Sequence, residues 1–371
     1  MQIKPFQLER YFAEYEFKVR YLLSASDCES IPMRDLLAMA DAEMRAAWEA
    51  LALGYTEAPG HPLLRAEVAR LYERVGADQV LTAVPEEAIF IAMNALLSPG
   101  DGVIVVAPAY QSLYEIARSL GGEVTFWNLA PSGGEWRLDV RFLADRITPR
   151  TRLLVVNFPH SPTGYLPSRR DFDAILELAE RHGLYVFSDE MYRLLEYEPA
   201  RRLPAACDVY ERAVTLSGLS KSFGLPGLRV GWLASRDAPS MQRFAKLKDY
   251  TTICGSAPAE ILATIALRAR DALIARSLEI VRGNLAEAGS FFGRHPEMFQ
   301  WLPPRAGSVA FPALVSEPVD ELCRDVLERE GVMIVPARMF DYPGNHFRVG
   351  LGRRNFPEAL SVLERYVVDR R

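Results

Sequence analysis

Short apolar runs alternate with helical segments through the middle of this chain, and this alternation constrains its fold more than any other feature. From residue 86 the expected order is helix 86–97, strand 102–106, helix 112–120, strand 124–127, strand 153–157, helix 171–182, strand 185–188 and strand 213–217. The strand segments are rich in valine, leucine and isoleucine, which is typical of strands buried on both faces. The pattern predicts an α/β fold in which helices flank a mostly parallel sheet.

The two ends of the chain have a different pattern. Apolar residues at helical spacing predict helices over 8–22, 35–53 and 62–75. After about residue 285 the expected order is helix, strand 308–311, helix 320–330, strands 333–335 and 346–350, and helix 356–367. Because 371 residues are many for a single core, we expect two domains. The larger one would comprise residues 46–285, and residues 1–45 and 286–371 would form a smaller α+β domain.

Composition narrows the class of partner. A net charge of -5 and a pI near 5.7 provide no basic surface for nucleic acid or for an anionic membrane. No segment reaches the roughly twenty apolar residues of a membrane span, and the first 17 residues lack a secretory pattern. The cysteines lie far apart, without metal-site spacing. We therefore expect a cytoplasmic protein that acts on small molecules, without a metal, nucleic-acid or membrane partner.

Polar residues follow several of the expected strands at the point where each strand ends. They are Tyr110 after strand 102–106, the segment 157–164 (Asn-Phe-Pro-His-Ser-Pro-Thr-Gly), Asp189 after strand 185–188, and the segment 217–221 (Ser-Gly-Leu-Ser-Lys). In open parallel sheets, ligands bind at the carboxyl ends of the strands. We therefore expect these side chains to converge on one site.

The pair Ser220-Lys221, followed by Gly-Leu-Arg-Val-Gly at 227–231, is the most specific motif of the chain. On these residues the chain resembles the fold type I pyridoxal 5'-phosphate (PLP) enzymes of the class I/II aminotransferase superfamily, over most of its length. In that family the lysine carries PLP as a Schiff base, and the arginine eight residues later binds the cofactor phosphate. The resemblance assigns these roles to Lys221 and Arg229.

The resemblance also implies a catalytic set of three side chains. A lysine must be deprotonated to condense with an aldehyde, and the amine of Lys221, once displaced by substrate, would move the α-proton as general base and acid. Asp189 would keep the pyridine nitrogen protonated, which makes the ring an electron sink. Tyr192 would donate to the phenolic oxygen of the cofactor. The structural alternatives are a solvated lysine, an N-cap aspartate and a packed core tyrosine.

Three further positions would bind cofactor or substrate. Tyr110 resembles the aromatic residue that stacks on the cofactor ring, with a plain core aromatic as the alternative. Tyr55 matches the tyrosine that reaches the phosphate in the neighbouring subunit, so the resemblance implies a homodimer with shared active sites. Arg348, in Phe-Arg-Val-Gly at 347–350, matches the arginine that binds the substrate α-carboxylate through its planar fork.

Two positions near the cofactor depart from the family pattern. Ser161 stands before Pro-Thr-Gly, where relatives carry an asparagine that donates to the phenolic oxygen, so this contact is expected to be weaker or mediated by water. Gly218 stands three residues before Lys221, where a phosphate-binding serine is common. The neighbouring His160 is expected to be neutral, either orienting Asp189 or packing beneath the cofactor.

The helix start at Glu86 and Glu87 also lacks the glycine and hydroxyl that relatives place near the phosphate. The phosphate would then rely on the helix amides from Glu86 onward, on Arg229 and on Tyr55. The carboxylate of Glu86 would be unfavourable beside a phosphate, so it is expected to turn away. The alternative is that the phosphate loop lies elsewhere in the chain.

Two reactions remain open. The first is transamination, in which the amino group of an α-amino acid moves to a keto acid. The second is elimination, replacement or cyclisation at the β- or γ-carbon, because the segment 24–30 is similar to that of capreomycidine synthase-like enzymes, which cyclise a hydroxylated arginine. Asp27 and Glu29 would then bind a cationic side chain, unless they are solvated loop acids or helix caps. A regulator without turnover is disfavoured by the acidic composition.

Overall fold

A seven-stranded sheet forms the centre of the protein, for which a computed structural model describes residues 2–369. The strand order is β2-β10-β9-β8-β7-β3-β4. Their bounds are β2 Val80–Ala83, β3 Gly102–Ala107, β4 Glu123–Asn128, β7 Thr151–Asn157, β8 Tyr185–Asp189, β9 Ala213–Gly218 and β10 Gly231–Ala234. Neighbours from β9 to β4 pair in parallel, whereas β10 pairs antiparallel with both β9 and β2.

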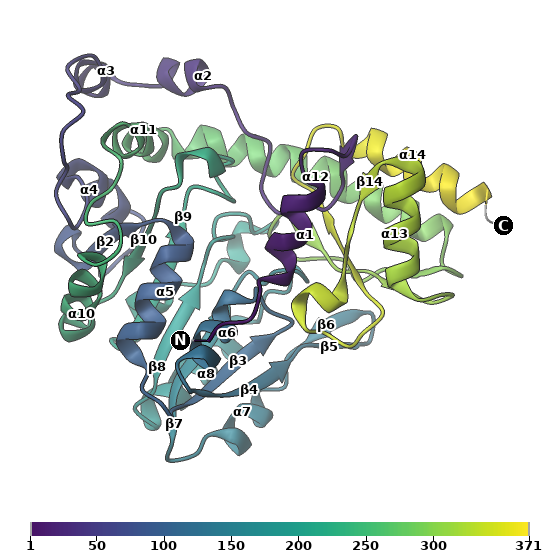
Figure 1. Ribbon diagram of the computed structural model, residues 1–371, viewed down its shortest axis with the longest axis horizontal. Helices are drawn as coiled ribbons and strands as arrows, with labels where there is room; N and C mark the ends of the chain where they lie inside the picture. Colours follow the sequence, from purple (N-terminus) through teal and green to yellow (C-terminus); the bar gives the residue numbers. More distant parts are fainter. Residues whose placement is uncertain (1, 370–371) are drawn as a thin grey trace.

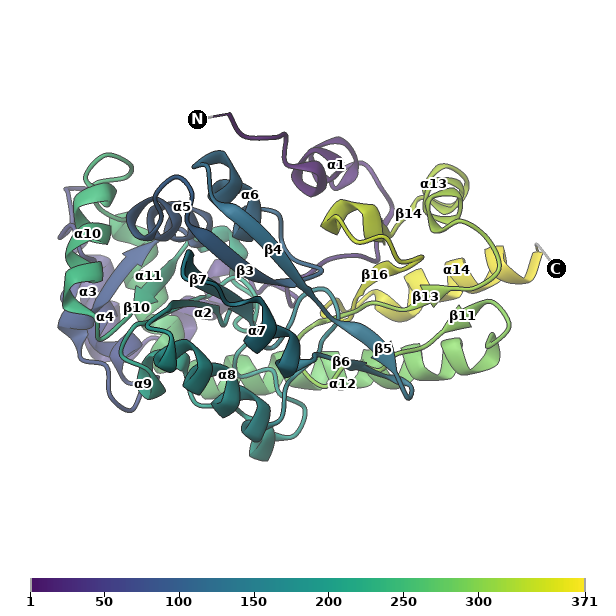
Figure 2. The same ribbon diagram turned by 90° about the horizontal axis from the view of Figure 1, so that it is seen from below.

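Helices cover both faces of this sheet (Figures 1 and 2). Alternate residues of β3 show this directly: Val103 and Val105 belong to the core beneath α5 (Pro85–Leu96) and α6 (Ser112–Ser119), whereas Ile104 and Val106 belong to the core that contains α8 (Arg169–Arg181). Side chains of successive strand residues point to opposite faces, so a strand buried on both sides must be apolar throughout. The predicted α/β fold class is confirmed.

The antiparallel strand β10 and the helical region that follows it were not predicted. After β10 come α10 (Ala238–Lys248), α11 (Ala257–Arg268) and the 25-residue α12 (Arg270–Arg294). Helix α12 runs from the sheet region into the carboxyl-terminal part of the protein (Figures 1 and 2). The remaining helices of the sheet region are α4 Pro62–Ala69, α7 Val140–Arg146 and α9 Ala206–Val209.

The amino-terminal segment differs from its predicted form. Helix α1 spans Gln7–Tyr15 and is followed by strand β1 (Tyr21–Leu22), where a single helix to residue 22 was predicted. The helix predicted over 35–53 is two helices, α2 (Met33–Ala38) and α3 (Ala42–Glu49). Asp41 separates them because its carboxylate accepts from the amide of Met44 at 2.8 Å and caps α3.

The carboxyl-terminal part is a mixed α+β assembly. It contains the sheet β12-β16-β15, the pair β11-β13, and β14, which pairs with β1 in parallel. The bounds are β11 Phe299–Gln300, β12 Val309–Ala310, β13 Ala313–Leu314, α13 Val319–Glu330, β14 Val332–Met333, β15 Val335–Pro336, β16 Phe347–Gly350 and α14 Phe356–Asp369. A hairpin, β5 (Ala130–Ser132) with β6 (Glu135–Arg137), lies beside it (Figure 2). The domain boundaries at residues 46 and 285 stay a prediction, and α2 and α3 pack in a core shared with α11.

Candidate active site

Lys221 lies just beyond the end of β9, in the loop before β10. Its Nζ atom donates a hydrogen bond of 2.7 Å to the hydroxyl of Ser26. The next residue, Ser222, is buried and donates to the carbonyl oxygens of Met191 at 3.2 Å and Arg193 at 2.6 Å. The loop that carries the lysine is therefore fastened to the turn that follows β8.

Asp189 is the last residue of β8, and its side chain is almost completely enclosed. The carboxylate accepts one backbone hydrogen bond, from Met191 at 3.1 Å, and makes no ion pair with any residue from 2 to 369. Burial raises the pKa of Asp189 to about 6, and the nearby Lys221 opposes that rise. A buried carboxylate without a cationic partner is costly, so this position suits a ligand that brings a positive charge.

The segment Ser24–Ser26 brings three of the expected residues together. The hydroxyl of Tyr192 donates to the carbonyl of Ser26 at 2.9 Å, and Nε of Arg348 donates to the carbonyl of Ser24 at 3.1 Å. The hydroxyl of Ser26 accepts from Lys221, as described above. Residues from the loop after β9, from the turn after β8 and from β16 therefore meet at one short stretch of chain.

The guanidinium of Arg348 is buried without a carboxylate to neutralise it. The residue is only 3% exposed, and the part of the chain that the structure describes offers it no ion pair. Its guanidinium carbon lies 5.5 Å from the ring centre of Phe12 and 5.4 Å from that of Phe340. Burial lowers the pKa of Arg348 from its usual value. A cation held in this way favours the arrival of an anionic group such as a carboxylate.

Tyr110 lies two residues before α6, and Glu86 lies in the first turn of the neighbouring helix α5. The hydroxyl of Tyr110 donates to Oε1 of Glu9 at 2.6 Å, and burial holds the pKa of Tyr110 well above its usual value. Glu86, in the first turn of α5, accepts from the hydroxyl of Ser112 at 3.2 Å. Its side chain reaches solvent, but surrounding protein atoms desolvate the carboxylate and raise the pKa of Glu86 to about 7.

The residues expected around a phosphate lie at the edge of this group. Arg229 is exposed, has a left-handed backbone (φ 55°), and donates to the carbonyl of Pro226 at 3.2 Å. The hydroxyl of Ser220, directly before the lysine, is buried with no hydrogen-bond partner among residues 2–369. The unpartnered hydroxyl of Ser220 and the guanidinium of Arg229, which forms no ion pair within residues 2–369, each leave donors free for an anion. Ser220 was not among the predicted phosphate ligands.

Glu87 and Gly218 have local structural roles. The Oε1 atom of Glu87 accepts from the hydroxyls of Thr251 and Thr252, the latter at 2.7 Å, and its Oε2 accepts from the amide of Val84 at 3.3 Å. Its carboxylate therefore fixes the start of α5 to the loop after α10. At Gly218 a Cβ atom would lie 3.0 Å from Cα of Gly231, because β9 and β10 approach closely there. A serine at position 218 would therefore be crowded against the backbone of β10.

Ser161 and His160 lie in the loop after β7, whose last residue, Asn157, pairs with Asp189 of β8. The amide of Ser161 donates to Oδ1 of Asn157 at 2.7 Å, and Nδ2 of Asn157 donates to the carbonyl of Asp189 at 2.8 Å. His160 is buried with Nδ1 2.8 Å from the hydroxyl of Thr163. Burial lowers the pKa of His160 to about 3, which keeps its imidazole neutral, as expected.

Asp27 and Glu29 have protein partners. The carboxylate of Asp27 forms an ion pair with Nη2 of Arg353 at 2.8 Å, and Oε2 of Glu29 accepts from the amide of Arg354 at 3.1 Å. The position predicted for a substrate guanidinium is thus adjacent to a protein guanidinium. A role of Asp27 and Glu29 in substrate binding stays a prediction.

Tyr55 stands apart from the other expected residues. Its side chain is 93% exposed, so within one chain it has no part in the site. Leu53 and Tyr250, which are 85% and 89% exposed, are similarly uncovered.

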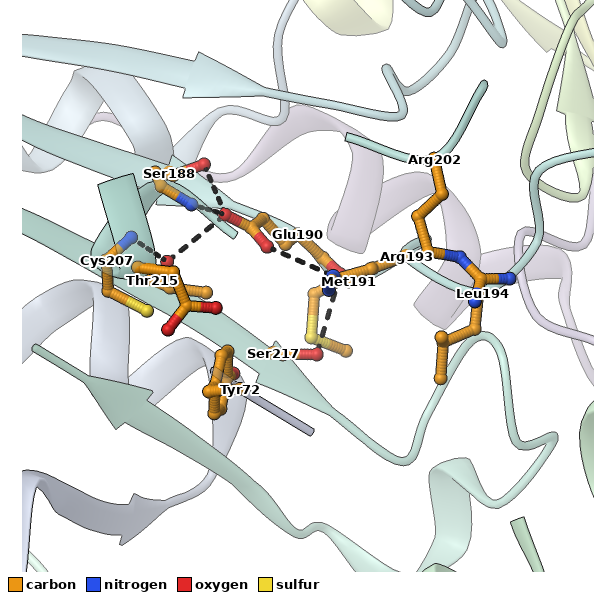
Figure 3. A network of polar contacts seen from close by, with 12 residues as sticks. Tyr72, Ser188, Glu190, Met191, Arg193, Leu194, Arg202, Cys207, Thr215 and Ser217 are labelled. Carbon is orange, nitrogen blue, oxygen red and sulfur yellow. Dashed lines mark hydrogen bonds and ion pairs between the residues drawn. The ribbon is translucent and has the colours of Figure 1, made fainter. Parts of the chain in front are cut away.

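Glu190, directly after Asp189, is a buried charged residue that was not predicted from the sequence. Oε1 of Glu190 accepts from the hydroxyl of Ser188 at 3.0 Å, the amide of Ala206 at 2.9 Å and the hydroxyl of Thr215 at 3.1 Å. Its Oε2 lies 3.7 Å from Nε of Arg193 (Figure 3). Burial raises the pKa of Glu190, and Arg193 opposes this. The network ties the ends of β8 and β9 together, which fixes the neighbouring aspartate.

These features together fit PLP. The enclosed carboxylate of Asp189 suits a protonated pyridine nitrogen, the free donors of Ser220 and Arg229 suit a phosphate, and Lys221 supplies an amine within the same group. Within residues 2–369, no helix has the length and apolar composition that a membrane span requires.

Comparisons with known proteins agree with this geometry. The family model "Aminotransferase class I and II" matches residues 23–360. The chain is 32% identical to capreomycidine synthase of Streptomyces vinaceus over 92% of this chain and 88% of that protein. It is also 32% identical to the probable N-succinyldiaminopimelate aminotransferase DapC of Mycobacterium tuberculosis, over 81% of this chain and 79% of that protein.

Solved structures extend the similarity. A PLP-dependent aminotransferase from Streptococcus suis superposes with a TM-score of 0.91 at 27% identity, over 100% of this chain and 98% of that one. The PLP-dependent cyclase OrfR superposes with a TM-score of 0.90 at 30% identity, over 100% of this chain and 99% of that one. The expectation of a PLP-dependent enzyme is confirmed. The chain belongs to the class I and II aminotransferase family.

Proposed function

We propose that this protein is an aminotransferase that moves the amino group of an α-amino acid to a keto acid through Lys221. The observation that carries this proposal is the meeting of Lys221, Tyr192 and Arg348 on the segment Ser24–Ser26. An amine, a phenol and an unpaired guanidinium around one point match an α-amino acid, whose carboxylate would bind Arg348. The family match and the similarity to aminotransferases support this reading.

Each side chain has a defined task in this proposal. When bound, PLP supplies an aldehyde that condenses with amines and a ring that accepts electron density from the α-carbon. Arg348 orients the substrate by its carboxylate, and Lys221 removes the α-proton and returns it to the acceptor carbon. Asp189 holds the proton on the pyridine nitrogen. The hydroxyl of Tyr192, which donates to the carbonyl of Ser26 in this structure, would donate a hydrogen bond to the phenolic oxygen of the cofactor.

The phosphate end of the cofactor would be held by different groups. Arg229 and Ser220 supply donors from this chain, together with the first-turn amides of α5. We infer that Tyr55 completes the site from a partner subunit, so that the protein acts as a homodimer. Its 93% exposure supports this arrangement, because residues 2–369 of its own chain leave the ring almost uncovered. The four cysteines are unpaired, which fits an enzyme of the reducing cytoplasm.

A second reaction is favoured by specific similarities. The chain is 32% identical to capreomycidine synthase, and the structure of the cyclase OrfR superposes on all of it. In that reading a β-hydroxyl leaves as water and a nucleophile of the same substrate replaces it, so the amino group stays on the product. The residues that bind the α-carboxylate and move the α-proton would be the same.

One experiment separates the two reactions. The purified protein with PLP is mixed with a panel of amino acids, among them β-hydroxylated and guanidino amino acids, without a keto acid. Transamination predicts at most one equivalent of keto acid for each active site, and turnover only after pyruvate or 2-oxoglutarate is added. Repeated turnover without an acceptor would refute transamination and support the elimination or cyclisation reading. Lys221→Ala is the control and should be inactive in either case.

A further inference from the structure

Helix α1 lies between α6 and the carboxyl-terminal part of the protein in both views (Figures 1 and 2). Its start is joined to the residue after Tyr110, because the amide of Gln7 donates to Oε1 of Gln111 at 2.9 Å and Nε2 of Gln111 donates to the carbonyl of Pro5 at 3.0 Å. The side chain of Phe6 makes no capping hydrogen bond. Gln111 therefore replaces the missing cap of α1.

The same helix contacts the carboxyl-terminal part. Nε2 of Gln7 donates to Oδ1 of Asp341 at 3.2 Å, and the hydroxyl of Tyr11 donates to the carbonyl of Ile334 at 3.4 Å. The ring of Phe12 lies 5.5 Å from the guanidinium carbon of Arg348. Helix α1 thus bridges the two parts of the protein beside the candidate site.

Glu9 is the residue of α1 that contacts Tyr110 through a hydrogen bond. Its Oε1 accepts from the hydroxyl of Tyr110 at 2.6 Å, a length typical of a hydrogen bond from a hydroxyl to an ionised carboxylate. The ring of Phe6 meets Tyr110 edge-on, with the ring centres 4.8 Å apart. The ring of Tyr110 is therefore held by a ring contact with Phe6 and by a hydrogen bond from its hydroxyl to Glu9, two residues of the same segment.

We propose that Glu9 is a positioning residue that fixes the plane of the Tyr110 ring against the cofactor, so that α1 is a structural part of the active site. This inference rests on the proposed function, in which Tyr110 stacks on PLP. Glu9 touches neither the cofactor nor the substrate and acts through the tyrosine. Phe12, three residues further along α1, contacts the guanidinium of Arg348 with its ring and so helps to hold a second residue of the site.

The test uses Glu9→Ala, Tyr110→Phe and the double variant, with Glu14→Ala as the matched control. Glu14 is an exposed carboxylate on the same helix whose contact is with Tyr15, not with the site. Two quantities are measured: the dissociation constant of PLP from the apoprotein, and the visible circular dichroism of bound PLP, which reports the orientation of its ring. The midpoint of thermal unfolding shows that each variant is folded.

Each single variant is expected to raise the dissociation constant roughly three- to thirtyfold and to change the dichroism of the bound cofactor. The double variant should be no weaker than either single variant, because both remove the same hydrogen bond. Glu9→Gln, which keeps an acceptor oxygen, should recover part of the loss. A dissociation constant and dichroism unchanged in Glu9→Ala, or effects that add in the double variant, would overturn the inference. If wild-type protein binds no PLP, the proposed function fails as well.

Discussion

The Nζ atom of Lys221 and the hydroxyl of Ser26 are in hydrogen-bond contact at 2.7 Å, although 195 positions separate the two residues in sequence. The residue that is expected to carry the cofactor is therefore oriented by the amino-terminal segment. Ser26→Ala removes this contact but keeps the backbone carbonyl to which Tyr192 donates. We expect kcat to fall about three- to tenfold, as for the loss of one hydrogen bond. Ser30→Ala in the same segment is the control, and equal rates for the two variants would contradict the account.

Arg348 is expected to dominate substrate binding. Arg348→Ala removes two charged hydrogen bonds to a carboxylate, worth roughly 3 to 6 kcal/mol, so kcat/KM should fall by about 10² to 10⁴. The measurement is the steady-state rate with the best amino acid of the panel. Arg354→Ala, at an exposed position nearby, should have little effect. An unchanged kcat/KM for Arg348→Ala would exclude Arg348 from the site.

Asp189 makes the stability of the apoprotein depend on pH. Its pKa in the folded protein is about 6, above the ordinary value of 3.8, so its ionised form is disfavoured by folding. The native state therefore binds this proton more strongly than the unfolded state does. The contribution of Asp189 to the free energy of unfolding is present below about pH 4 and is lost as the pH rises through about 6. The full loss is roughly 3 kcal/mol.

Comparison with Asp189→Asn isolates this contribution. The variant cannot ionise there, so the free energy of unfolding of the variant minus that of wild-type apoprotein should increase between pH 4 and pH 7. Chemical denaturation at several pH values measures it. A difference that is constant over this range would show that Asp189 does not titrate as described. Bound PLP should diminish the effect, because a protonated pyridine nitrogen would pair with the carboxylate.

Gly218 is expected to be required for packing. Gly218→Ala places a methyl group 3.0 Å from Cα of Gly231 and from the carbonyl oxygen of Val230, which should cost about 1 to 3 kcal/mol of unfolding free energy. Gly227→Ala is the matched control, because a Cβ atom there meets nothing within 4 Å. Urea denaturation of both variants tests this, and equal stabilities would show that β9 and β10 separate at little cost.

The sequence predicted the sheet better than it predicted the ends of the chain. The sequences of β3, β7 and β8 contain short continuous apolar runs, and β9 is largely apolar, so their position in a sheet buried on both faces follows from that composition. The helix predicted to residue 22 instead ends at Tyr15, because Tyr21 and Leu22 pair with β14. No local pattern reveals a partner strand more than 300 residues away.

The residues of the candidate site likewise divide into those that could be predicted from the sequence and those that could not. Lys221 and Arg348 could be predicted because each lies in a specific motif, and Asp189 because it ends a strand of the parallel sheet. Glu9, Ser26 and Glu190 could not, since their importance comes from contacts with Tyr110, with Lys221 and with several elements around β8. Position relative to a strand can be inferred from sequence, whereas the partner of a polar side chain depends on tertiary packing.

Every role proposed for the site depends on the covalent attachment of PLP to Lys221, and borohydride reduction followed by peptide mapping detects that bond. Protein loaded with PLP is reduced, digested and mapped by mass spectrometry, and the variant Lys221→Ala is treated in the same way. Lys248, a buried lysine that donates to the carbonyl of Ala58, is the internal reference. We expect a phosphopyridoxyl group on the peptide that contains Lys221, and none on that peptide in the variant. An unmodified Lys221 in cofactor-loaded wild-type protein would contradict it.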